Sequence, residues 1–97
     1  MPTVRWLPRF GADFDRLTPT QQAAFLAAVA LFVEDLRAGR QFGKGLRVKG
    51  VQGAPGIFEL TWADDGRATF QYGEAVIEGE PHVVWRRIGT HEIFKRP

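Results

Sequence analysis

The sequence predicts an α+β domain in which an N-terminal strand and a helical hairpin pack on one face of a small, mostly antiparallel β-sheet. The hydrophobic periodicity changes once along the 97 residues, near residue 40, from a helical to an extended pattern. After that point three runs are typical of strands. The length suits one core and excludes a two-domain enzyme with an interdomain cleft. We therefore expect a single domain over residues 1–97.

The N-terminal third predicts a strand and two helices. Residues 3–7 form an apolar, β-branched run that stops at Pro8, and Phe10–Leu17 has the spacing of a short helix. A longer helix is predicted from Thr18, which can cap it together with Gln21 as a capping box. Gly39 is expected to end this helix.

Two faces of the long helix carry apolar residues. The stripe expected to face the sheet contains Phe25, Val29, Phe32 and Leu36. The far side contains Ala23, Ala27, Ala30 and Leu31, where a water-facing helix usually carries charge. We expect the neighbouring helix to cover this far side, with a partner protein as the alternative.

The three extended runs, residues 57–63, 67–72 and 82–88, predict an antiparallel sheet with one apolar and one polar face. A three-residue loop, 64–66, with Gly66 in the left-handed conformation would pair Trp62 with Ala68, Leu60 with Phe70 and Phe58 with Tyr72. A two-residue loop would mix apolar and polar residues on one face. The preferred register leaves a water-exposed face that carries Glu59, Thr61, Arg67, Thr69 and Gln71, with Glu59 opposite Gln71. Strand alternation allows only one of Arg86 and Arg87 onto that face.

The composition excludes several kinds of site. The chain contains no Cys, Ser or Asn, which excludes disulfides, thiolate zinc sites and Cys or Ser nucleophiles. It has only two histidines, His82 and His91, so we expect no metal site. The longest uncharged apolar run, residues 23–33, is too short to span a membrane. We expect a soluble cytoplasmic protein that does not bind membranes.

Basic residues cluster in two places although the formal net charge is only +2. Between residues 37 and 49 there are five basic residues and no acidic one, and the chain ends with a second basic group. The residues expected to contact nucleic acid are Arg40, Lys44, Arg47, Lys49, Arg86 and Lys95. This clustering indicates a partner that carries phosphates, although basic residues that only maintain solubility are the alternative.

Three segments of the sequence resemble the RelE/ParE superfamily of toxins from type II toxin–antitoxin systems. They are GIFEL at 56–60, DGRATF at 65–70 and GTHEIFK at 89–95, and with the order of elements the resemblance covers nearly the whole chain. It implies a RelE-like fold, a cognate antitoxin, a cytoplasmic location and no metal or cofactor. Many members cleave mRNA on the ribosome, whereas the ParE branch inhibits DNA gyrase.

The resemblance also implies roles for particular residues. Arg67 matches the arginine of the hairpin strand, and Arg87 or Arg86 lies near the second arginine of the family. His91 and Glu59 are then the candidate acid and base of a metal-independent endoribonuclease. Phe94 departs from the pattern, because several ribonuclease members have a tyrosine near this place. The alternatives are a gyrase inhibitor and a non-toxic binding protein with the same fold.

Overall fold

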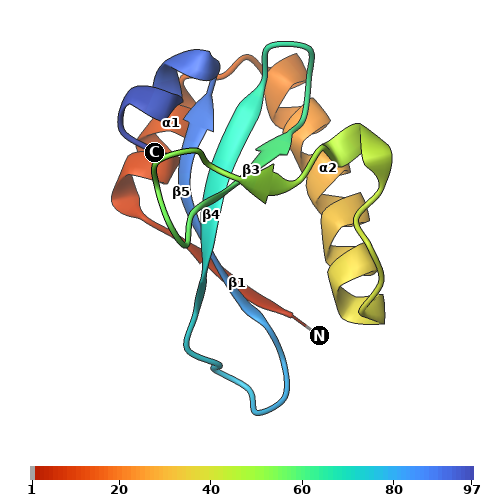
Figure 1. Ribbon diagram of the computed structural model, residues 1–97. Coiled ribbons are helices and arrows are strands. Elements are labelled where there is room, and N and C mark those ends of the chain that lie inside the picture. Colours follow the sequence, from red (N-terminus) through yellow and green to blue (C-terminus); the bar gives the residue numbers. More distant parts are fainter. Residues whose placement is uncertain (1) are drawn as a thin grey trace.

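The computed structural model describes residues 2–97 and consists of a five-stranded sheet with two helices packed on one face (Figure 1). The strands are β1 (Thr3–Trp6), β2 (Lys49–Gly50), β3 (Phe58–Thr61), β4 (Arg67–Gly73) and β5 (His82–Gly89). The helices are α1 (Pro8–Asp15) and α2 (Pro19–Ala38), with two short 3₁₀ helices, η1 (Lys44–Leu46) and η2 (His91–Lys95). The strand order is β1-β5-β4-β3-β2, and only the β1–β5 pair is parallel. The predicted fold class is confirmed.

Helix α2 begins and ends as its sequence predicts. The Thr18 hydroxyl accepts a hydrogen bond from the backbone N–H of Gln21, and the Gln21 side-chain oxygen accepts one from the backbone N–H of Thr18. These two bonds form a capping box, which satisfies amides that the first helical turn leaves without partners. The helix ends at Gly39, whose φ of 68° is left-handed.

The core is a cluster of aromatic rings around Trp85 of β5. The rings of Phe10, Phe25, Phe32 and Phe70 lie around that indole, with centroids 5.3 to 6.0 Å away. Because Trp85 contacts residues of both helices, α1 and α2 must cover the same face of the sheet. Phe25 and Phe32 are buried, so the predicted sheet-facing stripe of α2 is confirmed.

The far side of α2 is not covered by α1, contrary to expectation. Ala23, Ala27 and Ala30 are exposed, and Leu31 is 62% exposed. Helix α1 has only eight residues and packs along β5, so it does not reach this surface. An apolar surface on α2 therefore remains open in the isolated chain.

The β3–β4 hairpin keeps the predicted faces but not the predicted register. The paired residues are Phe58 with Phe70, Glu59 with Thr69, Leu60 with Ala68 and Thr61 with Arg67. The observed pairing is shifted by two residues from the expected one, so each side chain stays on its face. Glu59 consequently lies opposite Thr69 and not opposite Gln71.

The turn of this hairpin also differs from the prediction. The Trp62 amide donates to the Gly66 carbonyl and the Gly66 amide donates to the Ala63 carbonyl, so the turn is centred one residue earlier than expected. Gly66 does not adopt a positive φ. It is needed because the Trp62 ring lies against it, and a Cβ at this position would stand 2.6 Å from that ring.

A β-bulge in β5 places both arginines on the same face. Thr69 pairs with Arg87 but the next residue, Phe70, pairs with Trp85, which leaves Arg86 as the extra residue. Arg86 donates to the side chain of Gln71, which lies on the polar face of β4. The expectation that one of the two arginines leaves this face is therefore wrong, because the bulge interrupts the alternation.

Beyond the last residue of β1, helix α1 contacts the edge of β5. The last parallel pair is Trp6 with Trp85, and farther along β5 the amide of Ile88 donates to the carboxylate of Asp13. The same carboxylate accepts two hydrogen bonds from the Arg87 guanidinium, at 2.6 and 3.2 Å. Asp13 is buried, and these hydrogen bonds replace the water that its carboxylate loses.

The β4–β5 connection projects from the body of the domain at the end opposite η2 (Figure 1). It contains three glutamates, Glu74, Glu78 and Glu80, and no basic residue between positions 74 and 81.

Across residues 2–97, none of the helices is both long and apolar enough to cross a membrane.

The substitution Asp13→Ala is expected to lower the free energy of unfolding by roughly 3 kcal/mol, because it leaves the partly buried Arg87 without its counter-charge. Urea denaturation at neutral pH measures this change. Asp15→Ala is the matched control, since Asp15 lies on the same helix and is exposed. Its expected effect is within about 0.5 kcal/mol. Equal losses in the two variants would show that the Asp13–Arg87 pair does not stabilise the fold.

Candidate functional site

The sheet face opposite the helices carries the predicted polar residues, and we call it the polar face. Its members on β3, β4 and β5 are Glu59, Thr61, Arg67, Thr69, Gln71, Arg86 and Arg87. The face is less open to water than expected, because Glu59 and Arg67 are each 9% exposed and Thr69 is fully buried. Residues after β5 fold back over it, and Ile93 of η2 is buried there.

The last two residues, Arg96 and Pro97, which we call the tail, lie over the polar face. The backbone oxygen of Pro97 accepts hydrogen bonds from the Thr69 hydroxyl at 3.1 Å and from Arg86 Nε at 3.0 Å. The Arg96 carbonyl accepts one from Arg87 Nη1 at 3.2 Å. The tail therefore binds three polar side chains of the face, two of which are arginines.

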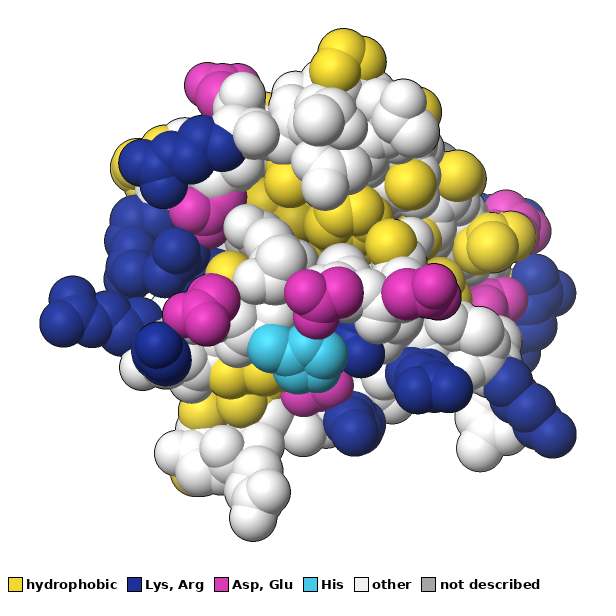
Figure 2. All heavy atoms as spheres, turned by 90° about the horizontal axis from the view of Figure 1, so that it is seen from above, with side chains coloured by type: hydrophobic (Ala, Val, Ile, Leu, Met, Phe, Trp, Pro, Cys, Tyr) yellow, Lys and Arg dark blue, Asp and Glu magenta, His cyan; other side chains and the backbone are white. Residues whose placement is uncertain are grey.

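His91 lies at the start of η2 and pairs with a residue of the β3–β4 turn. Its Nδ1 is 2.5 Å from an oxygen of the Asp65 carboxylate, and both side chains are exposed, His91 to 60%. The Phe94 ring lies edge-on to the imidazole with centroids 5.7 Å apart. These two contacts fix the ring and leave Nε2 without a partner among the described residues. Figure 2 shows a histidine beside acidic side chains on this end of the molecule.

Asp65 is a site residue that the sequence reasoning missed. The sequence predicts Asp65 only as a residue of the turn. Its contact with His91 is hard to predict because the two positions are 26 residues apart. The only signal in the sequence was that β4 and β5 are antiparallel neighbours, which brings the start of β4 close to the end of β5.

Arg67 is anchored by the turn that precedes it. Its Nη1 donates to the carbonyls of Ala63, Asp64 and Gly66 at 3.2, 3.2 and 2.9 Å. Nε and Nη2 have no protein partner among the described residues, and no carboxylate pairs with this guanidinium. Arg67 pairs with Gly89 across the ladder, two residues before His91. The anchored arginine and the His91–Asp65 pair therefore lie at the same end of the sheet.

The other predicted cations differ in whether a carboxylate neutralises them. Three of them form ion pairs: Arg40 with Asp35, Lys49 with Glu59 and Lys95 with Glu92, at 2.7, 3.9 and 3.0 Å. The hydrogen bond from Arg40, together with one from the Gly43 amide, lowers the pKa of Asp35 below its ordinary value. Lys44 and Arg47 have no such partner among residues 2–97. Arg86 binds only Gln71 and the tail.

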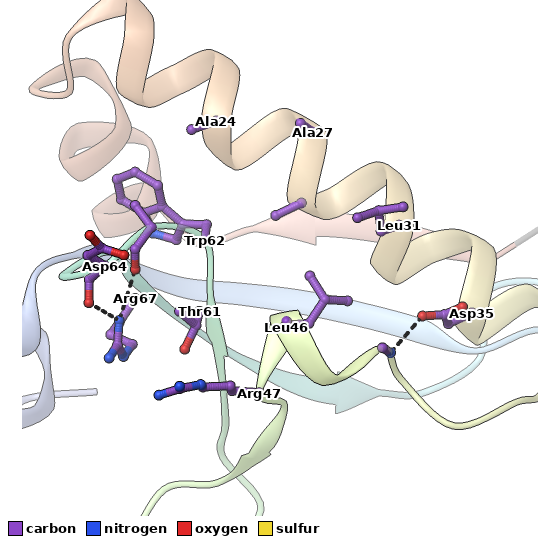
Figure 3. A pocket seen from close by; sticks show the side chains of 14 residues that line it. Ala24, Ala27, Leu31, Asp35, Leu46, Arg47, Thr61, Trp62, Asp64 and Arg67 are labelled. Atoms are coloured by element: carbon purple, nitrogen blue, oxygen red, sulfur yellow. Dashed lines mark hydrogen bonds between the residues drawn. The ribbon is translucent and has the colours of Figure 1, made fainter.

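Arg47 has no carboxylate partner among the described residues, and its backbone conformation is unusual. Its φ of 47° makes it the one described non-glycine residue in the left-handed region, where it ends η1. Such a conformation costs about 1 kcal/mol or more and is found more often at functional sites. The Arg47 side chain extends toward the end of the sheet that holds Arg67 (Figure 3).

A groove of about 770 Å³ separates α2 from η1 and the β3–β4 hairpin (Figure 3). Its apolar walls come from Ala24, Ala27, Leu31, Leu46 and Trp62. Arg47 and Arg67 lie at its polar side. The groove is continuous with the exposed far side of α2, because Ala27 and Leu31 belong to both.

The described residues offer few groups for a metal ion. Nowhere in residues 2–97 do three His, Asp or Glu side chains come close enough together to hold one. The groups gathered at this end of the sheet are the His91 imidazole, the Asp65 carboxylate and the Arg67 guanidinium.

Searches with the sequence found no matching family model and no matching curated protein. Solved structures share the fold. A chain of the Escherichia coli DinJ–YafQ complex has a TM-score of 0.66 and 11% identity over 95% of this chain and 96% of its own. The YoeB/ParE toxin from Agrobacterium tumefaciens also has a TM-score of 0.66, with 11% identity over 92% of this chain and 98% of its own.

A third similar structure is the RelBE2 toxin–antitoxin complex of Mycobacterium tuberculosis. It has a TM-score of 0.61 and 21% identity over 94% of this chain and 100% of the matched chain. The similarity thus extends over nearly the full length of both chains in each comparison. The protein has the RelE-like fold of these toxins.

Proposed function

We propose that this chain is the toxin of a type II toxin–antitoxin system and cleaves mRNA on the ribosome. The observation that carries the proposal is the His91–Asp65 pair, which lies at the same end of the sheet as the anchored Arg67 on a RelE-like fold. Three solved structures with this fold are described as toxins or as toxin–antitoxin complexes. The site needs no metal ion for the reaction below.

The reaction is an attack by the ribose 2′-hydroxyl on the adjacent phosphate. A bond forms between O2′ and phosphorus, the bond from phosphorus to O5′ breaks, and a cyclic phosphate and a 5′-hydroxyl result. The 2′-hydroxyl must lose a proton and O5′ must gain one. His91 Nε2 accepts the proton of the 2′-hydroxyl and returns it to O5′ as the bond from phosphorus to O5′ breaks, while Asp65 holds the imidazole through Nδ1 and sets its tautomer. Glu59, the other predicted acid or base, is buried, and its carboxylate lies 3.9 Å from Lys49 Nζ.

The guanidinium groups without carboxylate partners bind the phosphates. Arg67 is held rigid through Nη1, so its remaining nitrogens can donate to phosphate oxygens with little loss of side-chain freedom. Arg47 adds a second positive charge, because no acidic side chain among the described residues neutralises it. Among the residues predicted to contact nucleic acid, Arg40 is less available to bind a phosphate, because it forms an ion pair with Asp35.

Replacement of His91 by Gln is expected to slow cleavage of ribosome-bound mRNA by about 10²–10⁴-fold, because it removes the proton-transferring nitrogen. Asp65→Asn is expected to slow it by roughly 10- to 100-fold, since the ring keeps that nitrogen but loses the carboxylate that sets its tautomer. Single-turnover cleavage with purified ribosomes measures both rates. Glu92→Gln is the control, because Glu92 is adjacent and exposed but does not contact the imidazole.

Full cleavage by the His91→Gln variant would contradict this assignment. If mRNA stays intact while expression of the unchanged chain halts DNA supercoiling, the protein is a gyrase inhibitor. If expression stops neither translation nor supercoiling, the fold serves a binding function only.

We also propose that the antitoxin binds in the groove beside α2. The groove has apolar walls, and the surface of α2 that continues from it is exposed and apolar. Arg47 at its polar side favours a segment that carries an acidic residue. An amphipathic helix with one apolar face fits these features, and its binding would cover Ala27 and Leu31.

The substitution Leu31→Arg is expected to abolish rescue of growth by the protein encoded in the adjacent reading frame, while the toxin remains active. The reason is that a charged side chain would enter the apolar groove. Leu26→Arg is the matched control, because Leu26 is equally exposed on α2 but lies outside the groove. Rescue that fails for both variants or for neither would contradict this placement of the antitoxin.

A further inference from the structure

Another cavity, of about 480 Å³, lies where β1, α1 and α2 meet, and we call it the aromatic pocket. Trp6 lines it from the end of β1, Phe10 and Phe14 line it from α1, and Phe25 and Leu26 from α2. It shares no lining residue with the groove beside α2. The proposed function therefore leaves this pocket without a role.

Aromatic rings form both the inner wall and the edge of the pocket. Phe10 and Phe25 are buried, with ring centroids 5.6 Å apart, whereas Trp6 is 62% exposed. The Trp6 indole packs on the Phe10 ring, with centroids 6.1 Å apart and planes only 24° from parallel. This packing holds an exposed indole at the opening. The faces of aromatic rings carry partial negative charge and attract cations.

Asp15 is the only residue of the pocket with a charged side chain. It differs from Asp13, two residues earlier on α1, whose carboxylate is buried and bound by Arg87. Asp15 is exposed, and within residues 2–97 no basic side chain forms an ion pair with it. The negative charge of this carboxylate is therefore available to a ligand.

Gly11 leaves room for a ligand in the pocket. It lies inside α1, where glycine is less favourable than any residue except proline. Its φ is not positive, and an added Cβ would stand 3.9 Å from Trp6 Nε1, which is an ordinary contact. Neither the backbone nor a close approach thus requires glycine here. A larger side chain would extend into the pocket, which Gly11 also lines.

We propose that the aromatic pocket binds a small organic cation whose nitrogen carries alkyl groups in place of hydrogens, such as a quaternary ammonium. The ring faces attract its positive charge, and Asp15 supplies a full negative charge. The alkyl groups pack on the apolar walls. A cavity of about 480 Å³ also falls within the usual range for small-molecule sites. This inference does not depend on RNA cleavage.

Hydrogen bonding favours an alkylated nitrogen over the side chain of a lysine or an arginine. Among the side chains of the pocket, the Asp15 carboxylate is the only acceptor group. The ammonium of lysine has three N–H donors and the guanidinium of arginine has five. Most of these donors would lack an acceptor inside the pocket, which is costly. A quaternary ammonium has no N–H group to satisfy.

The test is a titration of the isolated protein with choline at neutral pH, followed through the NMR signal of the Trp6 indole N–H. The matched probe is the neutral alcohol in which a carbon atom replaces the nitrogen of choline, because it has the same shape without the charge. Choline is expected to bind about tenfold more tightly than this alcohol, since only the cation is attracted by the ring faces and by Asp15.

Variants assign the preference to particular residues, with the backbone amide of Leu26 as the reporter. Asp15→Asn is expected to weaken choline binding about threefold and to leave binding of the neutral alcohol unchanged. Trp6→Leu keeps an apolar side chain but removes the aromatic face, and a loss of about fivefold is expected for choline. Glu78→Gln is the control, because it makes the same change in charge on the β4–β5 connection, outside the pocket.

Gly11→Leu is expected to abolish binding of both probes, because the new side chain fills the pocket. A thermal melt shows whether this variant folds, and the Asp15→Asn comparison decides the matter even if it does not. Failure of choline to shift the Trp6 signal would overturn the proposal. Equal binding of choline and the neutral alcohol would do the same, and so would equal losses in Asp15→Asn and Glu78→Gln.

A parallel titration with N-acetyl-arginine amide tests the ligand class. Tighter binding of this amide than of choline would show that the pocket takes an arginine side chain of a protein, and would overturn the assignment to an alkylated ammonium. None of these measurements uses RNA or ribosomes. A chain that binds choline but leaves mRNA intact would defeat only the proposed function, and an active toxin that does not distinguish the two probes would defeat only this inference.

Discussion

The β-bulge at Arg86 allows β5 to contribute Trp85 to the core and two successive arginines to the polar face. A regular strand cannot keep Trp85 in the core and also place two successive arginines on the opposite face, because side chains alternate. The extra residue resolves this conflict: Trp85 stays at the centre of the aromatic cluster, and both arginines lie on the polar face. Asp13 then binds one arginine and the tail binds both.

The same end of the sheet collects the groups that the proposed chemistry needs. The β3–β4 turn provides Asp65 for the imidazole and three carbonyls that hold Arg67, so one turn positions two side chains of the site. The turn itself depends on Gly66, because the Trp62 ring leaves no room for a Cβ. The stability of the core and the geometry of the site are thus linked through a few backbone positions.

Much of the fold could be predicted from periodicity and capping, but most of the site could not. The capping box at Thr18 and the stripe through Phe32 depend on local spacing, which the sequence displays directly. The predicted register of the β3–β4 hairpin is wrong by two residues. The Trp62 ring packs on Gly66 in the observed turn, and the turn residues alone do not reveal such a contact. The bulge and the His91–Asp65 pair join distant positions, and a single sequence carries no signal for the distance between them.

We propose that the site promotes cleavage of ribosome-bound mRNA, in which a 2′-hydroxyl of the RNA attacks the adjacent phosphate. The most direct measurement is to incubate the protein with ribosomes that carry a defined mRNA and to determine the chemistry of the new ends. We expect an upstream fragment that ends in a 2′,3′-cyclic phosphate and a downstream fragment that begins with a 5′-hydroxyl. An mRNA that remains intact, or a downstream fragment that begins with a 5′-phosphate, would contradict it.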